Sequence, residues 1–172
     1  MQVFIIGKTK SGKSTLANLF LDKGYVIYEA GSWARKEFEM INEGSTDEFS
    51  NDFKENLTNY ALSKLKEDCY YSVKQYEKFL SEKKIHKKLI VGVRNPDDFL
   101  QMLRMDSQNK VIFINSEKKY SGSLELFEEG LRIIMDYLLW REKLGNPIEV
   151  IEIKEQEVSN KEIINQLLKD KL

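Results

Sequence analysis

The sequence is poor in cysteine, proline and glycine: its 172 residues include one cysteine, two prolines and nine glycines. The single Cys69 cannot form an internal disulfide, which favours a reducing compartment. So few glycines and prolines exclude collagen-like and linker-rich classes. No apolar run approaches the roughly 20 residues that a membrane-spanning helix needs. Because a strand-like run begins at Gln2, there is no room for a signal peptide, and we expect a cytoplasmic protein without a membrane partner.

The chain also lacks an excess of charge of either sign. Its 27 Lys and Arg residues nearly cancel 28 Asp and Glu residues, which leaves a formal net charge of −1. Dedicated polyanion binders usually carry a basic excess, so this balance argues against nucleic acid as a partner. It does not argue against a small phosphorylated ligand, for which one loop and a few arginines suffice. Nothing in the composition indicates an oligomeric state.

Apolar runs alternate with helical periodicity along the chain, which predicts a single domain. Strands are predicted at 3–6, 25–28, 89–93, 111–114 and 148–153, the last alternating apolar and acidic residues as an edge strand does. Helices are predicted at 15–21 and at 32–41, and two more are predicted within 47–84. Further helices are predicted to begin at residue 96, to lie around 127–138, and to follow a capping-box pattern at 159–162. This order predicts an α/β fold of three layers, with helices on both faces of a parallel sheet.

One segment, residues 7–14 (GKTKSGKS), matches the P-loop pattern G-x-x-x-x-G-K-[ST] at every fixed position. Gly7 and Gly12 allow backbone angles that point successive N–H groups at an anion, and the helix that follows adds its positive N-terminal end. Lys13 supplies a cation for the β- and γ-phosphates, and Ser14 offers a hydroxyl to Mg²⁺. The sequence therefore predicts ATP and Mg²⁺ as cofactors. The predicted nucleotide-binding residues are Gly7, Thr9, Ser11, Gly12, Lys13, Ser14 and Thr15, with Ser14 as the metal ligand.

Two arginines are candidates to bind a second phosphate. Arg94 directly follows the buried run at 89–93, and ligands of open α/β sheets bind at the carboxyl ends of the strands. Arg35 lies on the helix predicted after the second strand. The planar fork of arginine donates two parallel hydrogen bonds to a phosphate. We therefore expect Arg35 and Arg94 to bind the acceptor of a phosphoryl transfer.

These segments resemble the P-loop nucleoside monophosphate kinase group, which includes adenylate kinases, phage deoxynucleoside monophosphate kinases and dephospho-CoA kinases. Residues 30–35 (AGSWAR) are similar to the Gly-x-x-x-Arg segment that opens the acceptor-binding region of that group. Residues 92–98 (GVRNPDD) are similar to the segment in which an arginine grips the acceptor phosphate. The resemblance implies one P-loop kinase domain over 1–172, with a helical acceptor-binding insert at about 32–88 and a lid-like helical region at about 118–145.

The chain departs from the pattern of that group in two places. The group often carries an acid at the end of the second or third strand, and here Glu29 and Asp97 are the nearest replacements. The group also closes a lid bearing paired arginines over the transferred phosphoryl group. In this chain the matching region, 118–141, has only Arg132 and Arg141.

Other residues that carry chemistry elsewhere are interpreted here as structural. One histidine and one cysteine cannot form a zinc site, and His86 is predicted to lie in a surface loop. Tyr25, Tyr28 and Trp33 lie near the second strand, where they have the chemistry to stack on an acceptor base, but we interpret them as packing residues.

The sequence therefore predicts ATP-dependent transfer of a phosphoryl group to a small, nucleotide-like acceptor. Lys13, Arg94 and Arg35 are the predicted catalytic residues, and the resemblance favours a nucleoside or deoxynucleoside monophosphate as acceptor. One alternative is a hydroxyl acceptor, either dephospho-CoA or a modified DNA base. Another is a switch protein that binds ATP without being a kinase. The missing lid arginines favour the switch, whereas the segments around Arg35 and Arg94 oppose it.

Overall fold

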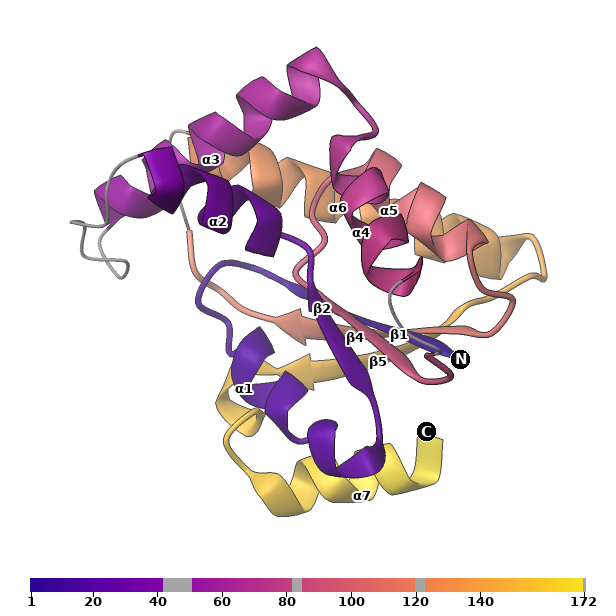
Figure 1. Cartoon of the computed structure of the whole chain (residues 1–172). Coiled ribbons are helices and arrows are strands. Elements are labelled where there is room, and N and C mark those ends of the chain that lie inside the picture. Colours follow the sequence, from indigo (N-terminus) through magenta and orange to yellow (C-terminus); the bar gives the residue numbers. More distant parts are fainter. Residues whose placement is uncertain (42–50, 82–84, 120–122, 172) are drawn as a thin grey trace.

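The computed structural model describes residues 1–41, 51–81, 85–119 and 123–171. It contains one five-stranded parallel sheet with the strand order β2-β3-β1-β4-β5 (Figure 1). The strands are β1 (Gln2–Gly7), β2 (Val26–Glu29), β3 (Lys88–Val91), β4 (Asn109–Asn115) and β5 (Glu149–Lys154). The α-helices are α1 (Lys13–Asn18), α2 (Ser32–Ile41), α3 (Asn51–Glu67), α4 (Tyr71–Ser81), α5 (Pro96–Arg104), α6 (Ser123–Lys143) and α7 (Lys161–Lys171), with 3-10 turns η1 (Leu21–Lys23) and η2 (Glu155–Glu157).

Strand β1 forms the centre of the sheet, and all six of its residues are buried. Its side chains alternate between the two faces: Val3 and Ile5 pack on one side, and Phe4 and Ile6 pack on the other. Both sides are apolar because β1 pairs with β3 and β4 and is covered by helices above and below. Among the described strands β5 pairs with β4 alone and alternates buried with exposed residues, so the predicted edge strand is confirmed.

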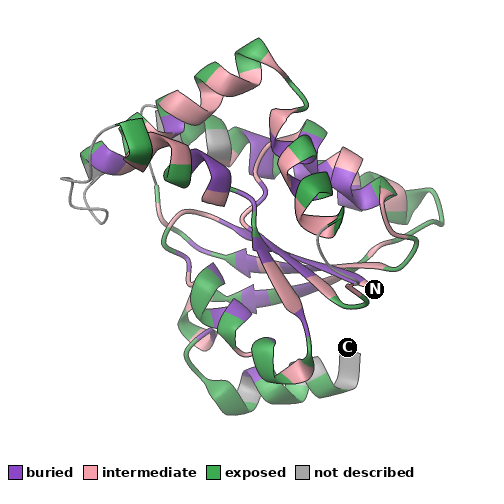
Figure 2. Cartoon of the chain, viewed as in Figure 1, coloured by how far each residue is buried: buried purple, intermediate pink, exposed green. Residues whose placement is uncertain are grey.

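Helices cover both faces of the sheet, which confirms the predicted three layers (Figure 1). On one face lie α1 and α7, which contribute Leu16 and Ile164 to the core. On the other lie α4, α5 and α6, which contribute Tyr76, Phe99 and Ile134. Burial therefore concentrates in the sheet and on the inner sides of these helices (Figure 2). None of the helices within the described ranges is long and apolar enough to cross a membrane.

Most element boundaries agree with the predictions; the end of the first helix and the capping residue of the last helix differ. Helices α3 and α4 confirm the two helices expected within 47–84, of which residues 47–50 and 82–84 lie outside the described ranges. The first helix ends early, at Asn18, and a 3-10 turn continues to Gly24, whose φ of 76° suits glycine. The last helix is capped by Asn160 Oδ1, which accepts a hydrogen bond from the backbone N–H of Glu162 at 3.1 Å.

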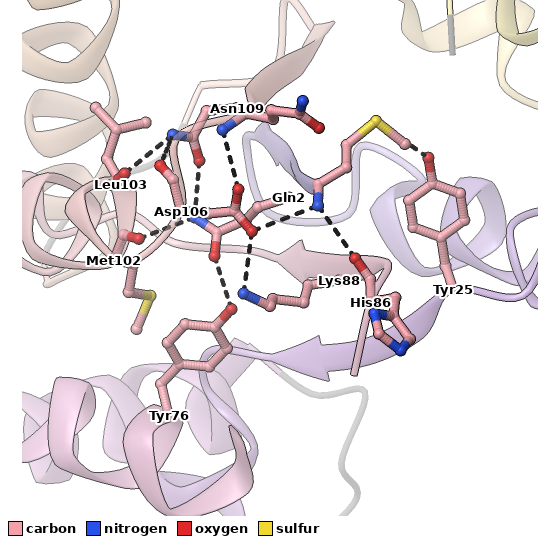
Figure 3. A network of polar contacts seen from close by, with 11 residues as sticks. Gln2, Tyr25, Tyr76, His86, Lys88, Met102, Leu103, Asp106 and Asn109 are labelled. Carbon is pink, nitrogen blue, oxygen red and sulfur yellow. Dashed lines mark hydrogen bonds and ion pairs between the residues drawn. The ribbon is translucent and has the colours of Figure 1, made fainter. Parts of the chain in front are cut away.

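A buried polar network lies at the amino ends of the strands, opposite the P-loop (Figure 3). The Gln2 side chain is fully buried; its Nε2 donates to Met102 O at 2.9 Å, and its Oε1 accepts from Tyr76 Oη at 2.8 Å. Beside it the Asp106 carboxylate pairs with Lys88 at 3.1 Å and with the N-terminal amine at 3.4 Å. The network fastens α4 and α5 to β1, so its role is structural.

Replacing Tyr76 with phenylalanine should destabilise the fold by about 1–3 kcal/mol, because it leaves the buried Gln2 Oε1 without its donor. Urea unfolding measures this change. Tyr25→Phe is the matched control: Tyr25 is also buried, but among the described residues its hydroxyl donates only to the sulfur of Met1, at 4.0 Å. Equal free energies of unfolding for the two variants would contradict the prediction.

Candidate functional site

The P-loop joins β1 to α1 at the carboxyl edge of the sheet, and its two fixed glycines are required by space and by backbone geometry. Gly12 has φ 89°, and a Cβ there would lie 2.9 Å from Val158 Cγ1. A Cβ on Gly7 would lie 2.9 Å from the carbonyl oxygen of Ile114. Because any side chain would push the loop away from β4 and η2, glycine at both positions keeps the loop closely packed.

Lys13, the first residue of α1, is buried within this loop. Its Nζ donates to the carbonyl oxygen of Gly7 at 2.9 Å and also to that of Lys8. Burial, reinforced by the positive charges of Arg94 and Lys118, holds the pKa of Lys13 well below its usual value. A desolvated amine surrounded by other cations gains strongly from an anion, so this position favours binding of a phosphate group.

Two lysine contacts brace the P-loop against the segment after β4. Lys8 Nζ donates to the carbonyl oxygen of Lys118 at 2.5 Å, and Lys118 Nζ donates to that of Lys10 at 2.5 Å. The Lys118 amine also pairs with the Glu155 carboxylate of η2, and that pairing lowers the pKa of Glu155. The loops that follow β1, β4 and β5 are therefore fastened together.

A cavity of about 600 Å³ opens beside the P-loop and runs beneath α2 and α3. It brings together Lys13, Ser14, Arg35 and Arg94, which the sequence places far apart. The other predicted nucleotide-binding residues also line it, except Gly7, which contributes the carbonyl that holds Lys13. Arg94 is half-buried and Arg35 is exposed. The cavity thus places two further cations, Arg35 and Arg94, in the same space as the P-loop.

The position of Arg94 depends on a close approach of α6. Gly130 of α6 lies against the carbonyl oxygen of Arg94, and a Cβ at this glycine would overlap that atom. Val93, which precedes Arg94, is also almost fully buried. The backbone that carries the Arg94 side chain is therefore fixed by its contact with Gly130 and by the burial of Val93.

Two carboxylates line the cavity, and the sequence identified one of them. Glu29, the last residue of β2, accepts a long hydrogen bond of 3.4 Å from Ser14 Oγ. Asp97 was the other expected acid, but it is exposed, and its neighbour Asp98 is the buried residue that lines the cavity. The reason lies in α5: Asp98 shares a helix face with the fully buried Met102, four residues on. That spacing is the signal by which Asp98 could have been found.

The Asp98 carboxyl is in an apolar setting that raises its pKa to about 6. Burial is the main cause; the negative charge of Asp97 adds to it, and a hydrogen bond from the Ser72 hydroxyl partly offsets it. At neutral pH the group is therefore still largely a carboxylate, and it is only 6% exposed.

The aromatic residues near β2 are buried, as predicted, and one of them also faces the site. Tyr25 and Tyr28 pack in the two cores on opposite faces of the sheet. Trp33 is 7% exposed, packs edge-on against Tyr71 with ring centroids 5.0 Å apart, and lines the cavity. Trp33 therefore has the predicted packing role and also lines the cavity, although the sequence analysis interprets it as a packing residue alone.

The arginines of the lid-like region have local partners. Arg132 pairs with Glu129 at 2.5 Å and with Asp136 at 2.9 Å on the surface of α6. Arg141 donates to the carbonyl oxygen of Asn146 at 3.0 Å. In the part of the chain that the structure describes, neither lines the cavity.

The residues present fit a magnesium ion. No group of three or more His, Cys, Asp or Glu side chains suited to a metal ion occurs within the described ranges. Mg²⁺ does not need such a cage, because it usually binds through one or two protein oxygens together with water and substrate phosphates. Ser14 Oγ and the Glu29 carboxylate, 3.4 Å apart, provide oxygen ligands of this kind beside Lys13.

The parallel sheet, the P-loop and the adjoining cavity define an α/β domain with a P-loop at the carboxyl edge of its sheet. No family model matches the chain. The chain is 26% identical over 178 residues to the dephospho-CoA kinase of Fusobacterium nucleatum subsp. nucleatum, an alignment that covers all of this chain and 83% of that protein. It shares its fold with the shikimate kinase of Aquifex aeolicus vf5, with a TM-score of 0.51, 19% identity, and coverage of 98% of this chain and 94% of that chain. The predicted resemblance to the P-loop kinases is confirmed.

Proposed function

We propose that the protein is a kinase that transfers the γ-phosphoryl group of ATP to a hydroxyl group of a small acceptor, with dephospho-CoA as the first candidate. The observation that carries this proposal is Glu29, a carboxylate at the end of β2 beside Ser14 and in one cavity with Arg35 and Arg94. The kinase group that the sequence resembles often carries an acid at the end of the second or third strand, and Glu29 is an acid at the end of β2. The relationship to a dephospho-CoA kinase over the whole chain supports the same choice.

On the donor side, Lys13 and the backbone N–H groups of the P-loop hold the β- and γ-phosphates of ATP. Ser14 and Glu29 are the residues that hold Mg²⁺. The ion supplies positive charge to the phosphates when bound. The brace between Lys118 and Glu155 keeps the loop in place, so the donor is positioned by a preformed site.

On the acceptor side, Glu29 takes the proton of the attacking hydroxyl as its oxygen bonds to the γ-phosphorus, while the bond from that phosphorus to the β,γ-bridging oxygen breaks and ADP leaves. Arg94 and Arg35 bind phosphate groups of the acceptor and align it with the donor. Arg94 contributes more, because its backbone is held by Gly130 of α6 and by the buried Val93, whereas Arg35 lies exposed on α2. Positioning and charge neutralisation account for most of the catalysis in such reactions.

A nucleoside or deoxynucleoside monophosphate is the second candidate acceptor. The observation that favours it is the pair of arginines lining the cavity, which matches a single acceptor phosphate held by two cations. Such a phosphate attacks through an oxygen that is already ionised, so it needs no base. The two acceptor classes therefore differ in what they require of Glu29.

An acceptor screen with ATP labelled at the γ-phosphate tests the proposal. We expect dephospho-CoA to raise ADP formation at least about tenfold above the acceptor-free rate, because water competes poorly as nucleophile in a closed kinase site. The common ribo- and deoxyribonucleoside monophosphates form the comparison panel. If a monophosphate is used instead, the second candidate stands. If no acceptor raises turnover and a protein binds only the ATP-loaded chain, the protein is a switch and the kinase proposal fails.

A further inference from the structure

Helix α6 carries two apolar stripes, and only one of them packs into the core. Leu131, Ile134 and Leu138 form the inner stripe and are buried. The second stripe, which we call the outer stripe, consists of Leu126, Ile133, Tyr137, Trp140 and Leu144. Its spacings of seven, four, three and four residues place these side chains along one line of the helix surface. Leu144 directly follows α6, and its N–H donates to Trp140 O at 3.1 Å, which continues the helical turn.

The outer stripe is open to solvent over most of its length. Trp140 is 56% exposed, and Leu126, Ile133 and Leu144 are exposed as well. These four account for almost half of the nine exposed large hydrophobic side chains among the described residues, so the apolar surface is concentrated here rather than scattered. The rings of Tyr137 and Trp140 lie 6.2 Å apart within the stripe, and both residue types are enriched in protein interfaces.

The pattern of the outer stripe is nearly symmetric about its midpoint. Leu126 and Leu144 lie at equal distances from that midpoint, and so do Ile133 and Tyr137. Two copies of α6 that pack antiparallel therefore bring Leu126 opposite Leu144 and Ile133 opposite Tyr137. Trp140 then falls between Leu126 and Ile133 of the other copy. A two-fold interface needs such self-complementarity, because each copy presents the same surface to the other.

The charges beside the outer stripe favour the same orientation. Glu125 and Glu129 flank its N-terminal half, and Lys143 lies on the same flank at its C-terminal end. Antiparallel packing places Lys143 of one copy near Glu125 and Glu129 of the other, whereas parallel packing places like charges side by side. Between these ends Arg132 and Asp136 pair with each other at 2.9 Å. The acidic half of the flank also disfavours an anionic membrane surface as the occupant.

The area of the outer stripe fits a weak association. Its exposed side chains present roughly 450 Å² per copy, so a symmetric pair buries about 900 Å² in total. Stable interfaces begin at about 1,000–1,200 Å², and smaller ones are typical of transient complexes. We therefore expect a dissociation constant in the micromolar range.

We propose that the outer stripe of α6 is the interface of a homodimer, in which two α6 helices pack antiparallel across a two-fold axis. No residue of α6 lines the cavity in the described part of the chain, so the inference does not depend on the proposed function. The helix nevertheless supports the site from its other side. Gly130 lies against the Arg94 carbonyl, and Glu128 pairs with Lys8 of the P-loop at 3.7 Å.

Sedimentation velocity of the full chain over about 1–200 µM tests the dimer, because this range spans micromolar dissociation constants. The wild type should shift from monomer to dimer as its concentration rises, and Trp140→Ser should raise the dissociation constant at least about tenfold. Leu21→Ser is the matched control: Leu21 is 54% exposed but lies in η1, and its replacement should leave the dissociation constant unchanged. Lys143→Glu should weaken the dimer, and adding Glu125→Lys in the same chain should restore it.

Disulfide cross-linking tests the orientation of the two helices. In a Cys69→Ser background, which removes the exposed native thiol, one batch of protein carries Leu126→Cys and a second carries Leu144→Cys. Oxidation with copper phenanthroline should link the two in a mixture and should link neither batch with itself, because only antiparallel helices bring these positions together.

Three results would overturn the proposal. The first is a monomeric wild type at every concentration, including the case in which that monomer binds neutral lipid vesicles with a shift in Trp140 fluorescence. The second is a dimer that survives unchanged in Trp140→Ser, since its interface then lies elsewhere. The third is cross-linking of Leu126→Cys with itself, which indicates parallel helices.

Discussion

Lys13→Ala should lower kcat/KM for ATP-dependent phosphoryl transfer by at least about 10²–10³-fold. The amine lies inside the P-loop, which we propose holds the β- and γ-phosphates, and a preorganised donor where charge develops during transfer contributes about 3–4 kcal/mol to the transition state. Steady-state kinetics with the acceptor identified by the screen, together with ATP binding by calorimetry, measure the loss.

The fold should survive this substitution. Lys13 is buried with a lowered pKa, so burying its ammonium costs free energy, and removing it should leave the unfolding temperature unchanged or raise it slightly. Lys66→Ala, on the exposed side of α3, is the control and should keep activity within a few-fold. If folded Lys13→Ala has full activity, the P-loop does not hold the phosphoryl donor.

The donor half of the site was predictable from sequence because it is local. A P-loop is defined by eight consecutive residues whose glycines fix the backbone, and the flanking strand and helix are evident from hydrophobic patterning. The structure adds the reason for each glycine: Gly7 and Gly12 lie too close to β4 and Val158 for any side chain. The parallel sheet and the three layers were predictable for the same reason, because the spacing of apolar residues along each segment indicates whether it is a strand or a helix.

The acceptor half was harder, because it depends on strand order and on helix rotation. Glu29 reaches Ser14 although β2 and β1 are separated in the sheet by β3, an arrangement that no local pattern shows. Asp97 and Asp98 are adjacent in sequence and chemically identical, and only the rotation of α5 decides that Asp98 faces the cavity. The brace formed by Lys118 joins loops more than 100 residues apart in the chain.

Glu29→Gln should separate the two acceptor classes. Glutamine keeps the size of the side chain and its ability to contact Ser14 but cannot take a proton. With a hydroxyl acceptor such as dephospho-CoA, kcat should fall by about 10²–10⁴-fold, the usual contribution of a general base. With a monophosphate acceptor, whose oxygens are already ionised, the same substitution should cost far less. Single-turnover kinetics with each acceptor measure the chemical step directly.

Magnesium dependence distinguishes the two roles that Glu29 can combine. If its main contribution is to hold the ion, raising the Mg²⁺ concentration should restore the rate of Glu29→Gln, because mass action compensates for a weaker site. If it is the base, saturating Mg²⁺ leaves the defect, because the added ion cannot take the proton of the acceptor hydroxyl. Glu125→Gln, exposed on α6, is the matched control and should behave as the wild type. If Glu29→Gln phosphorylates dephospho-CoA at nearly the wild-type rate at any Mg²⁺ concentration, then Glu29 neither acts as the base nor holds the ion, and both roles proposed for it are wrong.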